Sequence, residues 1–135
     1  MVETVTEAQL KNLLAAEPGL REETDTPYTS PFLRLLVSLE REQLSDSLIT
    51  RRCQPGEIIF REEERGDVMY LIWSGRVAIV KGDLDAPSIL SYKGAGEIIG
   101  EMALLENQPR SASVIALEEV HLQGMNRQRL QQLLQ

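Results

Sequence analysis

The chain has 135 residues, of which 42% are hydrophobic and 26% are charged, and it carries a net charge of −7. This composition is typical of one soluble globular domain, and the acidic balance lacks the basic surface expected of a nucleic-acid-binding protein. No run of about 18 apolar residues is present, which excludes a helical membrane span. The N-terminus is acidic and lacks the features of a secretory signal, and the chain has a single cysteine, so we expect a cytoplasmic protein.

The first predicted element is a helix over residues 6–16. Thr6 and Gln9 have the spacing of a capping box, and the Pro-Gly pair at 18–19 is expected to end the helix. Three leucines are expected to share one face of this helix: Leu10, Leu13 and Leu14. A polar stretch with a proline follows, so we interpret residues 1–29 as an N-terminal helix and a linker.

Residues 30–48 are expected to hold two further helices. Ser30-Pro31 has the form of an N-cap followed by proline at the first helical position. Apolar residues then recur at helical spacing from Phe32 to Leu39, and a second short helix is predicted over 41–47.

From Leu48 onward, short apolar runs alternate with glycine-bearing turns, which is typical of an antiparallel sandwich or barrel. Two hairpin turns are predicted, at Ser74–Arg76 and at Lys81–Asp83. Cys53 is expected to be a small, partly buried strand residue. From Asn126 to Gln135 the pattern returns to that of a helix.

The segment from Gly100 to Ser113 contains the residues that favour binding chemistry. A short helix after Gly100 would present free backbone N–H groups, which suit an anion, and Arg110 would add a guanidinium fork that matches phosphate oxygens. Glu101 would repel a phosphate, so it either accepts a hydrogen bond from a sugar hydroxyl or holds Arg110 in place. These residues predict a pocket for a phosphorylated sugar; the alternative is a structural ion pair on a loop.

The same residues carry a family resemblance. The segments GEMALL, from Gly100 to Leu105, and PRSASV, from Pro109 to Val114, resemble the phosphate-binding cassette of cyclic nucleotide-binding domains. These domains occur in catabolite activator proteins, cyclic-nucleotide-dependent kinases and gated channels. The stretch from Pro55 to Val80 resembles the family's second and third strands. The resemblance covers residues 30–135.

The resemblance implies a mainly β fold. The expected architecture is an antiparallel β-roll of the double-stranded β-helix or jelly-roll type, preceded by N-terminal helices and followed by one short helix. Two departures stand out. Glu63 occupies a turn position where the family often has glycine, and the family's final helix, which covers the base, is not expected within the sequence ending at Gln135. The chain therefore resembles a piece of a longer protein or a domain that receives its lid from elsewhere.

The resemblance also implies roles for individual residues. Arg110 would pair with the cyclic phosphate, and Glu101 would accept a hydrogen bond from the ribose 2′-hydroxyl. The Ser111 hydroxyl would contact the phosphate or the base, and serine here favours cAMP over cGMP because threonine often accompanies cGMP preference. The remaining predicted contacts come from backbone groups: Gly100, Met102, Ala103 and Ala112.

We therefore expect a sensor domain without catalysis, cofactor or metal site, which binds a cyclic nucleotide and regulates an output domain outside this chain. The only histidine, His121, has no partners for a metal site or a catalytic triad. The alternative is a ligand-free scaffold or dimerisation module that keeps the fold, and a homodimer is left open. Direct DNA binding is not expected, because no room remains for a C-terminal helix-turn-helix.

Overall fold

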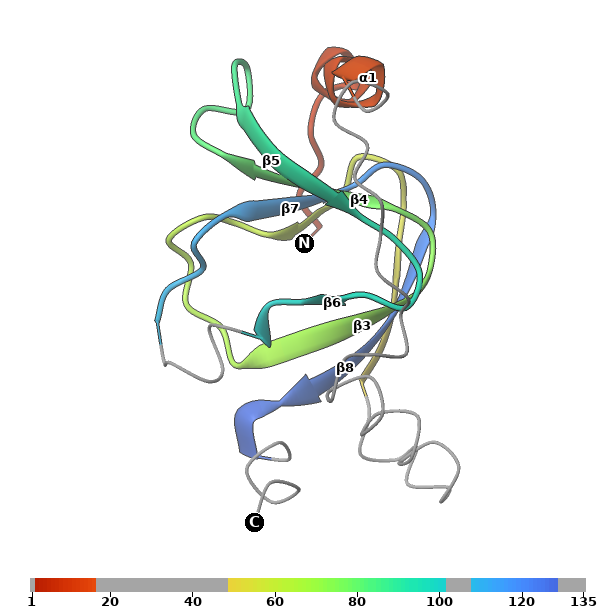
Figure 1. Cartoon of the computed structure of the whole chain (residues 1–135), viewed down its shortest axis with the longest axis vertical. Helices are drawn as coiled ribbons and strands as arrows, with labels where there is room; N and C mark the ends of the chain where they lie inside the picture. The colour runs from red at the N-terminus through yellow and green to blue at the C-terminus, as the bar shows by residue number, and fades with distance from the viewer. Residues whose placement is uncertain (1, 17–48, 102–107, 129–135) are drawn as a thin grey trace.

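The computed structural model describes residues 2–16, 49–101 and 108–128 (Figure 1). The predicted helices within 30–48 lie outside these ranges, as does most of the one predicted after Asn126. The described elements, in chain order, are α1 (Glu7–Ala16), β1 (Ile49–Cys53), β2 (Ile58–Phe60), β3 (Val68–Ser74), β4 (Val77–Lys81), β5 (Ser88–Lys93), β6 (Ile98–Ile99), β7 (Ser113–Ala116) and β8 (Val120–Asn126).

The strands form two antiparallel sheets that face each other (Figure 1). One sheet has the strand order β1-β8-β3-β6, and the other has the order β2-β7-β4-β5. Side chains from both sheets meet in one buried cluster: Cys53, Ile59, Phe60, Tyr70, Ile72, Val77, Ile99, Val114, Ala116, Val120 and Leu122. This arrangement confirms the predicted antiparallel β-roll.

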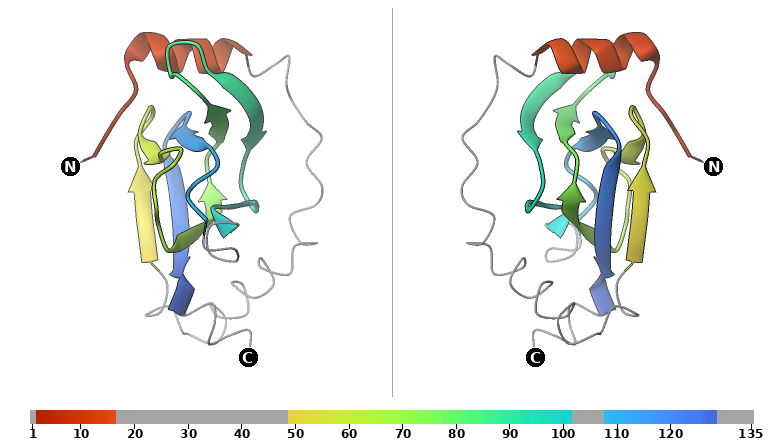
Figure 2. Two further views of the ribbon diagram at one scale, coloured as in Figure 1. Left: turned by 90° about the vertical axis from the view of Figure 1, so that its left-hand side faces the viewer. Right: turned by 90° about the vertical axis from the view of Figure 1, so that its right-hand side faces the viewer.

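Strand β4 explains why the second sheet is buried on both faces. Successive side chains of a strand point to opposite faces. Val77 and Ile79 accordingly pack in the cluster between the sheets, whereas Ala78 and Val80 pack in a second cluster with α1. Figure 2 shows α1 lying across the outer side of the roll.

The capping box of α1 is confirmed. The Thr6 N–H donates to Gln9 Oε1 at 2.8 Å, and the Gln9 N–H donates to Thr6 Oγ1 at 3.1 Å. Leu13 is 2% exposed and its carbonyl accepts a hydrogen bond from Tyr92 Oη, whereas Leu14 is 38% exposed. Of the three leucines predicted to share a face, Leu13 is buried and Leu10 packs against the same cluster, whereas Leu14 lies at the exposed edge of the contact.

The segment before α1 is joined to the roll by backbone hydrogen bonds. The Ile58 N–H donates to the Glu3 carbonyl, the Val5 N–H donates to the Gly56 carbonyl, and Thr4 forms a β-bridge with Glu57. Residues 2–16 thus cover the strand that carries Phe60, one of the residues of the site described below. The division of the chain at residue 29 stays a prediction.

One predicted hairpin is confirmed and the other is wrong. β4 and β5 pair as antiparallel neighbours around Gly82, as the Lys81–Asp83 signal predicts. β3 and β4, on either side of Gly75, lie in different sheets, so this turn carries the chain from one sheet to the other. Gly75 has φ +96°, and a Cβ atom there would lie 2.5 Å from the Glu119 carbonyl oxygen. The glycine is required by this crossing rather than by a hairpin.

Cys53 is fully buried, and burial raises the pKa of its thiol to about 12. The predicted position in a strand is confirmed, and Cys53 is buried more fully than predicted. The raised pKa disfavours the reactive thiolate. Across the described ranges, no helix is long and apolar enough to cross a membrane.

Candidate anion-binding site

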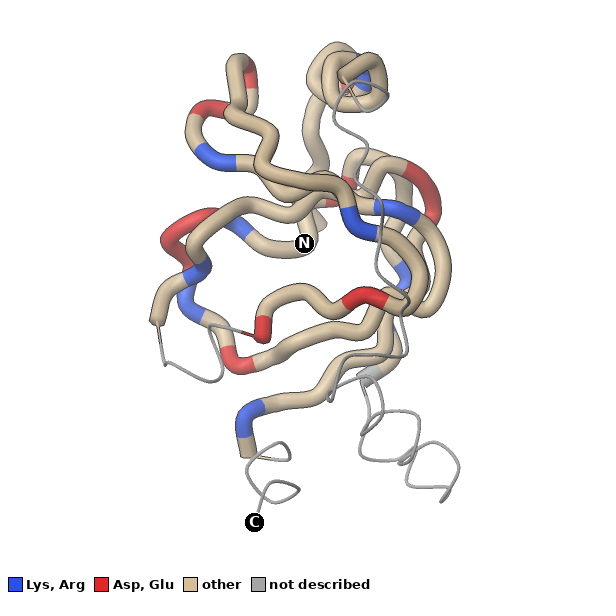
Figure 3. Tube along the Cα trace, in the orientation of Figure 1, with Lys and Arg blue, Asp and Glu red and all other residues tan. Residues whose placement is uncertain are grey.

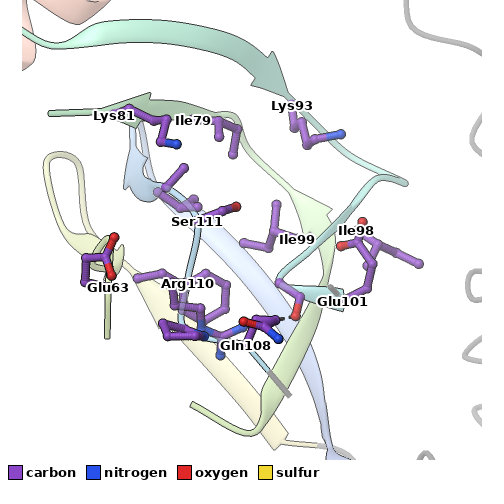
Figure 4. A pocket seen from close by; sticks show the side chains of 15 residues that line it. Glu63, Ile79, Lys81, Lys93, Ile98, Ile99, Glu101, Gln108, Arg110 and Ser111 are labelled. Atoms are coloured by element: carbon purple, nitrogen blue, oxygen red, sulfur yellow. Dashed lines mark hydrogen bonds between the residues drawn. The ribbon is translucent and has the colours of Figure 1, made fainter. Parts of the chain in front are cut away.

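A pocket of about 650 Å³ opens between the two sheets (Figure 4). Its volume lies within the range of small-molecule sites, roughly 300–1,000 Å³. The pocket is lined by five of the seven predicted site residues: Gly100, Glu101, Arg110, Ser111 and Ala112. The other two, Met102 and Ala103, lie outside the described residues. The structure thus brings both segments of the predicted cassette to one cavity.

Arg110 is the buried cation of this pocket. It immediately precedes the turn that leads into β7, and its side chain is 5% exposed. Its Nη1 donates to the Gly100 carbonyl at 3.0 Å, and its Nη2 donates to the Val68 carbonyl at 2.7 Å. The guanidinium is therefore held by two carbonyl groups from separate segments of the chain.

The charge of Arg110 is only partly compensated. Burial lowers the pKa of its guanidinium, although Glu64 and Asp67 act in the opposite direction. None of the ion pairs formed among the described residues includes Arg110, and its buried Nε has no hydrogen-bond partner within the same ranges. A buried N–H without an acceptor is costly, so the site is poised to gain from an anion.

Gly100 allows the close approach of the two segments. Its φ is +84°, a conformation that residues with a side chain rarely adopt. A Cβ atom at this position would lie 2.7 Å from Phe60 Cε2 and 2.8 Å from Arg110 Nη1. Glycine at position 100 therefore keeps both the ring and the guanidinium in their places.

Glu101 lines the pocket but does not hold Arg110. Arg110 Nη1 donates to the Gly100 carbonyl instead, and no hydrogen bond or ion pair between described residues joins Glu101 to Arg110. The alternative of a structural ion pair between these two side chains is therefore wrong. The Glu101 carboxylate stays available to accept hydrogen bonds from a ligand.

Several lining residues were not predicted from the sequence. Phe60 lies beneath Arg110, with the Arg110 Cζ atom 3.8 Å from the ring centroid. Lys81 and Lys93 line the opposite wall, from β4 and β5 (Figure 4). Val80 and Tyr92 are buried in the cluster with α1, so alternation places the neighbouring lysines on the opposite face, toward the space between the sheets. The sequence pattern does not show which of the two faces is covered by α1.

The pocket carries more positive charge than the chain as a whole. Among its described lining residues are three cations, Arg110, Lys81 and Lys93, and two carboxylates, Glu63 and Glu101. The chain itself has a net charge of −7. Figure 3 shows acidic and basic segments interspersed around the space between the sheets. Local donors, rather than the overall charge, therefore make this pocket suitable for an anion.

The turn before β3 connects directly to Arg110. The Glu63 N–H donates to the Arg110 carbonyl and the Arg110 N–H donates to the Glu64 carbonyl, both at 2.8 Å. Glu63 has φ +73°, the only described residue other than glycine with a positive φ. This is the position where the resemblance expects glycine, and the left-handed backbone is the physical reason for that preference.

The fold is a β-roll with a buried arginine in a pocket between its sheets. The chain matches the family model of the cyclic nucleotide-binding domain over residues 50–135. It belongs to this family.

Individual relatives agree with this assignment. The cAMP-dependent protein kinase regulatory subunit of Hypocrea atroviridis is 40% identical over 104 residues, which are 77% of this chain and 22% of the relative. The chain thus spans about a quarter or less of the length of such relatives.

Two solved structures are similar to the chain. The regulatory domain of Toxoplasma gondii PKA with cAMP is 30% identical, with a TM-score of 0.66, and the match covers 77% of this chain and 41% of that one. The EAL enzyme Bd1971, solved in cAMP-bound and cGMP-bound forms, is 43% identical, with a TM-score of 0.58, over 61% of this chain and 22% of that one.

Proposed function

We propose that this chain is a non-catalytic sensor domain that binds a cyclic nucleotide, with cAMP as the favoured ligand. The observation that supports this most directly is the buried Arg110 guanidinium, whose Nε lacks an acceptor among the described residues. Two of the five N–H donors of the guanidinium are used by carbonyl groups. A cyclic phosphate would supply the missing acceptor and the missing negative charge.

The other lining residues support the nucleotide part of the proposal. The Glu101 carboxylate would accept a hydrogen bond from the ribose 2′-hydroxyl. The Ala112 N–H would contribute a backbone contact, and the Ser111 hydroxyl would contact the phosphate or the base. Gly100, with Met102 and Ala103 beyond the described part, would contribute backbone contacts. The Ser111 side chain and the cAMP-dependent kinase relatives favour cAMP, while the cGMP-bound neighbour keeps cGMP as the competing ligand.

The output would come from a longer parent protein, and the site of action would be the cytoplasm. Ligand binding would shift the population of flanking segments, and an attached domain would respond to that shift. The kinase regulatory subunits, of which this chain matches only a part, support this view. The competing proposal is a scaffold that keeps the fold without a ligand, and it predicts no response to any nucleotide.

A thermal-shift series separates the two proposals. The chain is heated with cAMP, cGMP or 5′-AMP, the last being a nucleotide without the cyclic phosphate. A ligand present at 100 times its dissociation constant adds about 2.7 kcal/mol of stability, which should raise the melting temperature by several degrees. We expect the largest rise with cAMP and none with 5′-AMP. No rise with either cyclic nucleotide would support the scaffold.

A further inference from the structure

The buried guanidinium of Arg110 is held by hydrogen bonds and by a contact with an aromatic ring. Its two carbonyl acceptors lie at two corners of the fork, on Gly100 and Val68. Arginine has a long side chain with many rotamers, and ordering such a side chain during binding weakens the observed affinity. An arginine that is already held in place in the free protein avoids this cost.

Phe60 covers the flat face of the guanidinium. Arg110 Cζ lies 3.8 Å from the ring centroid, well within the 6 Å limit for a cation–π contact. Both side chains are about 5% exposed, so water screens this contact little. Phe60 ends β2, on the sheet opposite the Val68 carbonyl, and therefore supplies a support that comes from neither hydrogen-bonding partner.

The Phe60 ring also packs against a second aromatic ring. Phe60 stacks on Tyr70 of β3, with the centroids 5.6 Å apart and the planes inclined at 26°. Arg51 of β1 lies over the Tyr70 ring, with its Cζ 5.8 Å from the centroid, and forms an ion pair with the buried Glu57 at 3.1 Å. The stack thus crosses the core and leaves the Phe60 ring little freedom to move.

Two glycines lie against the terminal nitrogens of the guanidinium. A Cβ atom on Gly66 would lie 2.7 Å from Arg110 Nη2, and one on Gly100 would lie 2.8 Å from Nη1. Backbone therefore approaches the guanidinium where any side chain would displace it. Together with the Phe60 face, these contacts restrict Arg110 before any ligand arrives.

We propose that Phe60 is the positioning residue for Arg110, and that its aromatic face pre-orders the guanidinium for the phosphate of the ligand. This inference rests on the proposed function. It assigns to Phe60 an effect on affinity that acts through Arg110 rather than through the shape of the pocket wall.

The test is a double-mutant cycle measured by calorimetry with cAMP. Phe60→Leu keeps an apolar side chain but removes the aromatic face, and we expect it to weaken binding by about fivefold. In an Arg110→Gln background, the same Phe60→Leu change should alter the remaining affinity by less than about twofold. Phe60→Met repeats the cycle with a longer flexible side chain if the leucine variant does not fold.

Tyr92→Leu is the matched control. Tyr92 is also a buried aromatic residue, but it belongs to the cluster beneath α1 and does not line the pocket. This variant should lower the melting temperature while leaving the affinity for cAMP unchanged. A loss of affinity equal to that of Phe60→Leu would assign the effect to general destabilisation and overturn the proposal.

Two further outcomes would also overturn the proposal that Phe60 positions Arg110. Unchanged affinity in Phe60→Leu would show that Arg110 needs no aromatic support. An equal loss in both arginine backgrounds would show that Phe60 acts only as pocket wall. Failure of the proposed function is distinguished from these results, because it appears as absent cAMP binding in the unsubstituted chain.

Discussion

At the scale of the residue, Glu63 combines backbone strain with a carboxylate on the wall of the pocket. Its φ of +73° costs a residue with a Cβ atom about 1–2 kcal/mol. Its side chain lines the pocket, and no hydrogen bond or ion pair of that carboxylate occurs among the described residues. The turn is kept in place by the backbone pairing of Glu63 and Glu64 with Arg110.

Glu63→Gly should therefore stabilise the domain. The relief of strain exceeds the added chain entropy of glycine, so we expect the free energy of unfolding to rise by about 0.5–1 kcal/mol. Urea unfolding of the ligand-free protein measures this change. Glu63→Gln, which removes the charge and keeps the strain, is the control. If the glutamine variant gains as much stability, the effect comes from charge and the strain argument is wrong.

The proposed hydrogen bond from the ribose 2′-hydroxyl to Glu101 can be tested with a ligand that lacks this hydroxyl. A hydrogen bond to a carboxylate is worth about 1.5–3 kcal/mol, so a 2′-deoxy cyclic nucleotide should bind about ten- to a hundredfold more weakly than cAMP. Glu101→Ala should lose most of this discrimination. Competition binding with both ligands tests this, and equal discrimination in the two proteins would mean that another group contacts the hydroxyl.

At the scale of the element, α1 is fixed by one deeply buried side chain. Leu13 packs against the outer cluster of the second sheet, while Leu14 points largely to solvent. The two neighbouring leucines of one helix therefore form a natural pair for comparison.

Leu13→Ala should lower the free energy of unfolding by about 2–5 kcal/mol, because it leaves a cavity beneath α1. Leu14→Ala, which removes the same atoms from a mostly exposed position, should cost less than about 1 kcal/mol. Chemical denaturation of both variants gives the comparison. Similar losses in the two variants would show that α1 does not pack on the roll through Leu13.

The elements also show where sequence patterns are informative. Thr6 and Gln9 predicted the start of α1, because a capping box is a local interaction between residues three positions apart. The glycine at 75 predicted a turn but not its partner strands. Whether two strands pair or separate into different sheets depends on long-range packing, here the contact of Gly75 with the Glu119–Val120 backbone.

The same limit applies to the site. Arg110 and Glu101 were predictable because their spacing and small neighbours form a recognisable local cassette. Phe60 was not, because fifty positions separate it from Arg110 along the chain. The long-range pairing of β2 with β7, the strand that follows Arg110, brings the two residues together. The alternative of a Glu101–Arg110 ion pair could not be decided from the sequence for a similar reason, since the two carbonyls that accept from the guanidinium, of Gly100 and Val68, are known only from the fold.

At the scale of the whole molecule, the roll surrounds a cation that the ligand-free protein only partly compensates. An unpaired buried charge destabilises the free protein, and the same charge favours an anionic ligand. Replacing Arg110 with alanine should therefore affect the stability of the free protein and its affinity for the ligand in different ways. The ligand-free domain should remain folded, with an unchanged or higher melting temperature, while its affinity for the ligand falls.

Calorimetry of cAMP binding to the unsubstituted chain and to Arg110→Ala tests this most directly. The loss of a charge-assisted contact costs about 1.5–3 kcal/mol, so the dissociation constant should rise about ten- to a hundredfold or more. Arg110→Lys should also bind more weakly, because a point charge does not reproduce the guanidinium fork. Equal affinity in the unsubstituted and alanine proteins, with both folded by circular dichroism, would contradict the account.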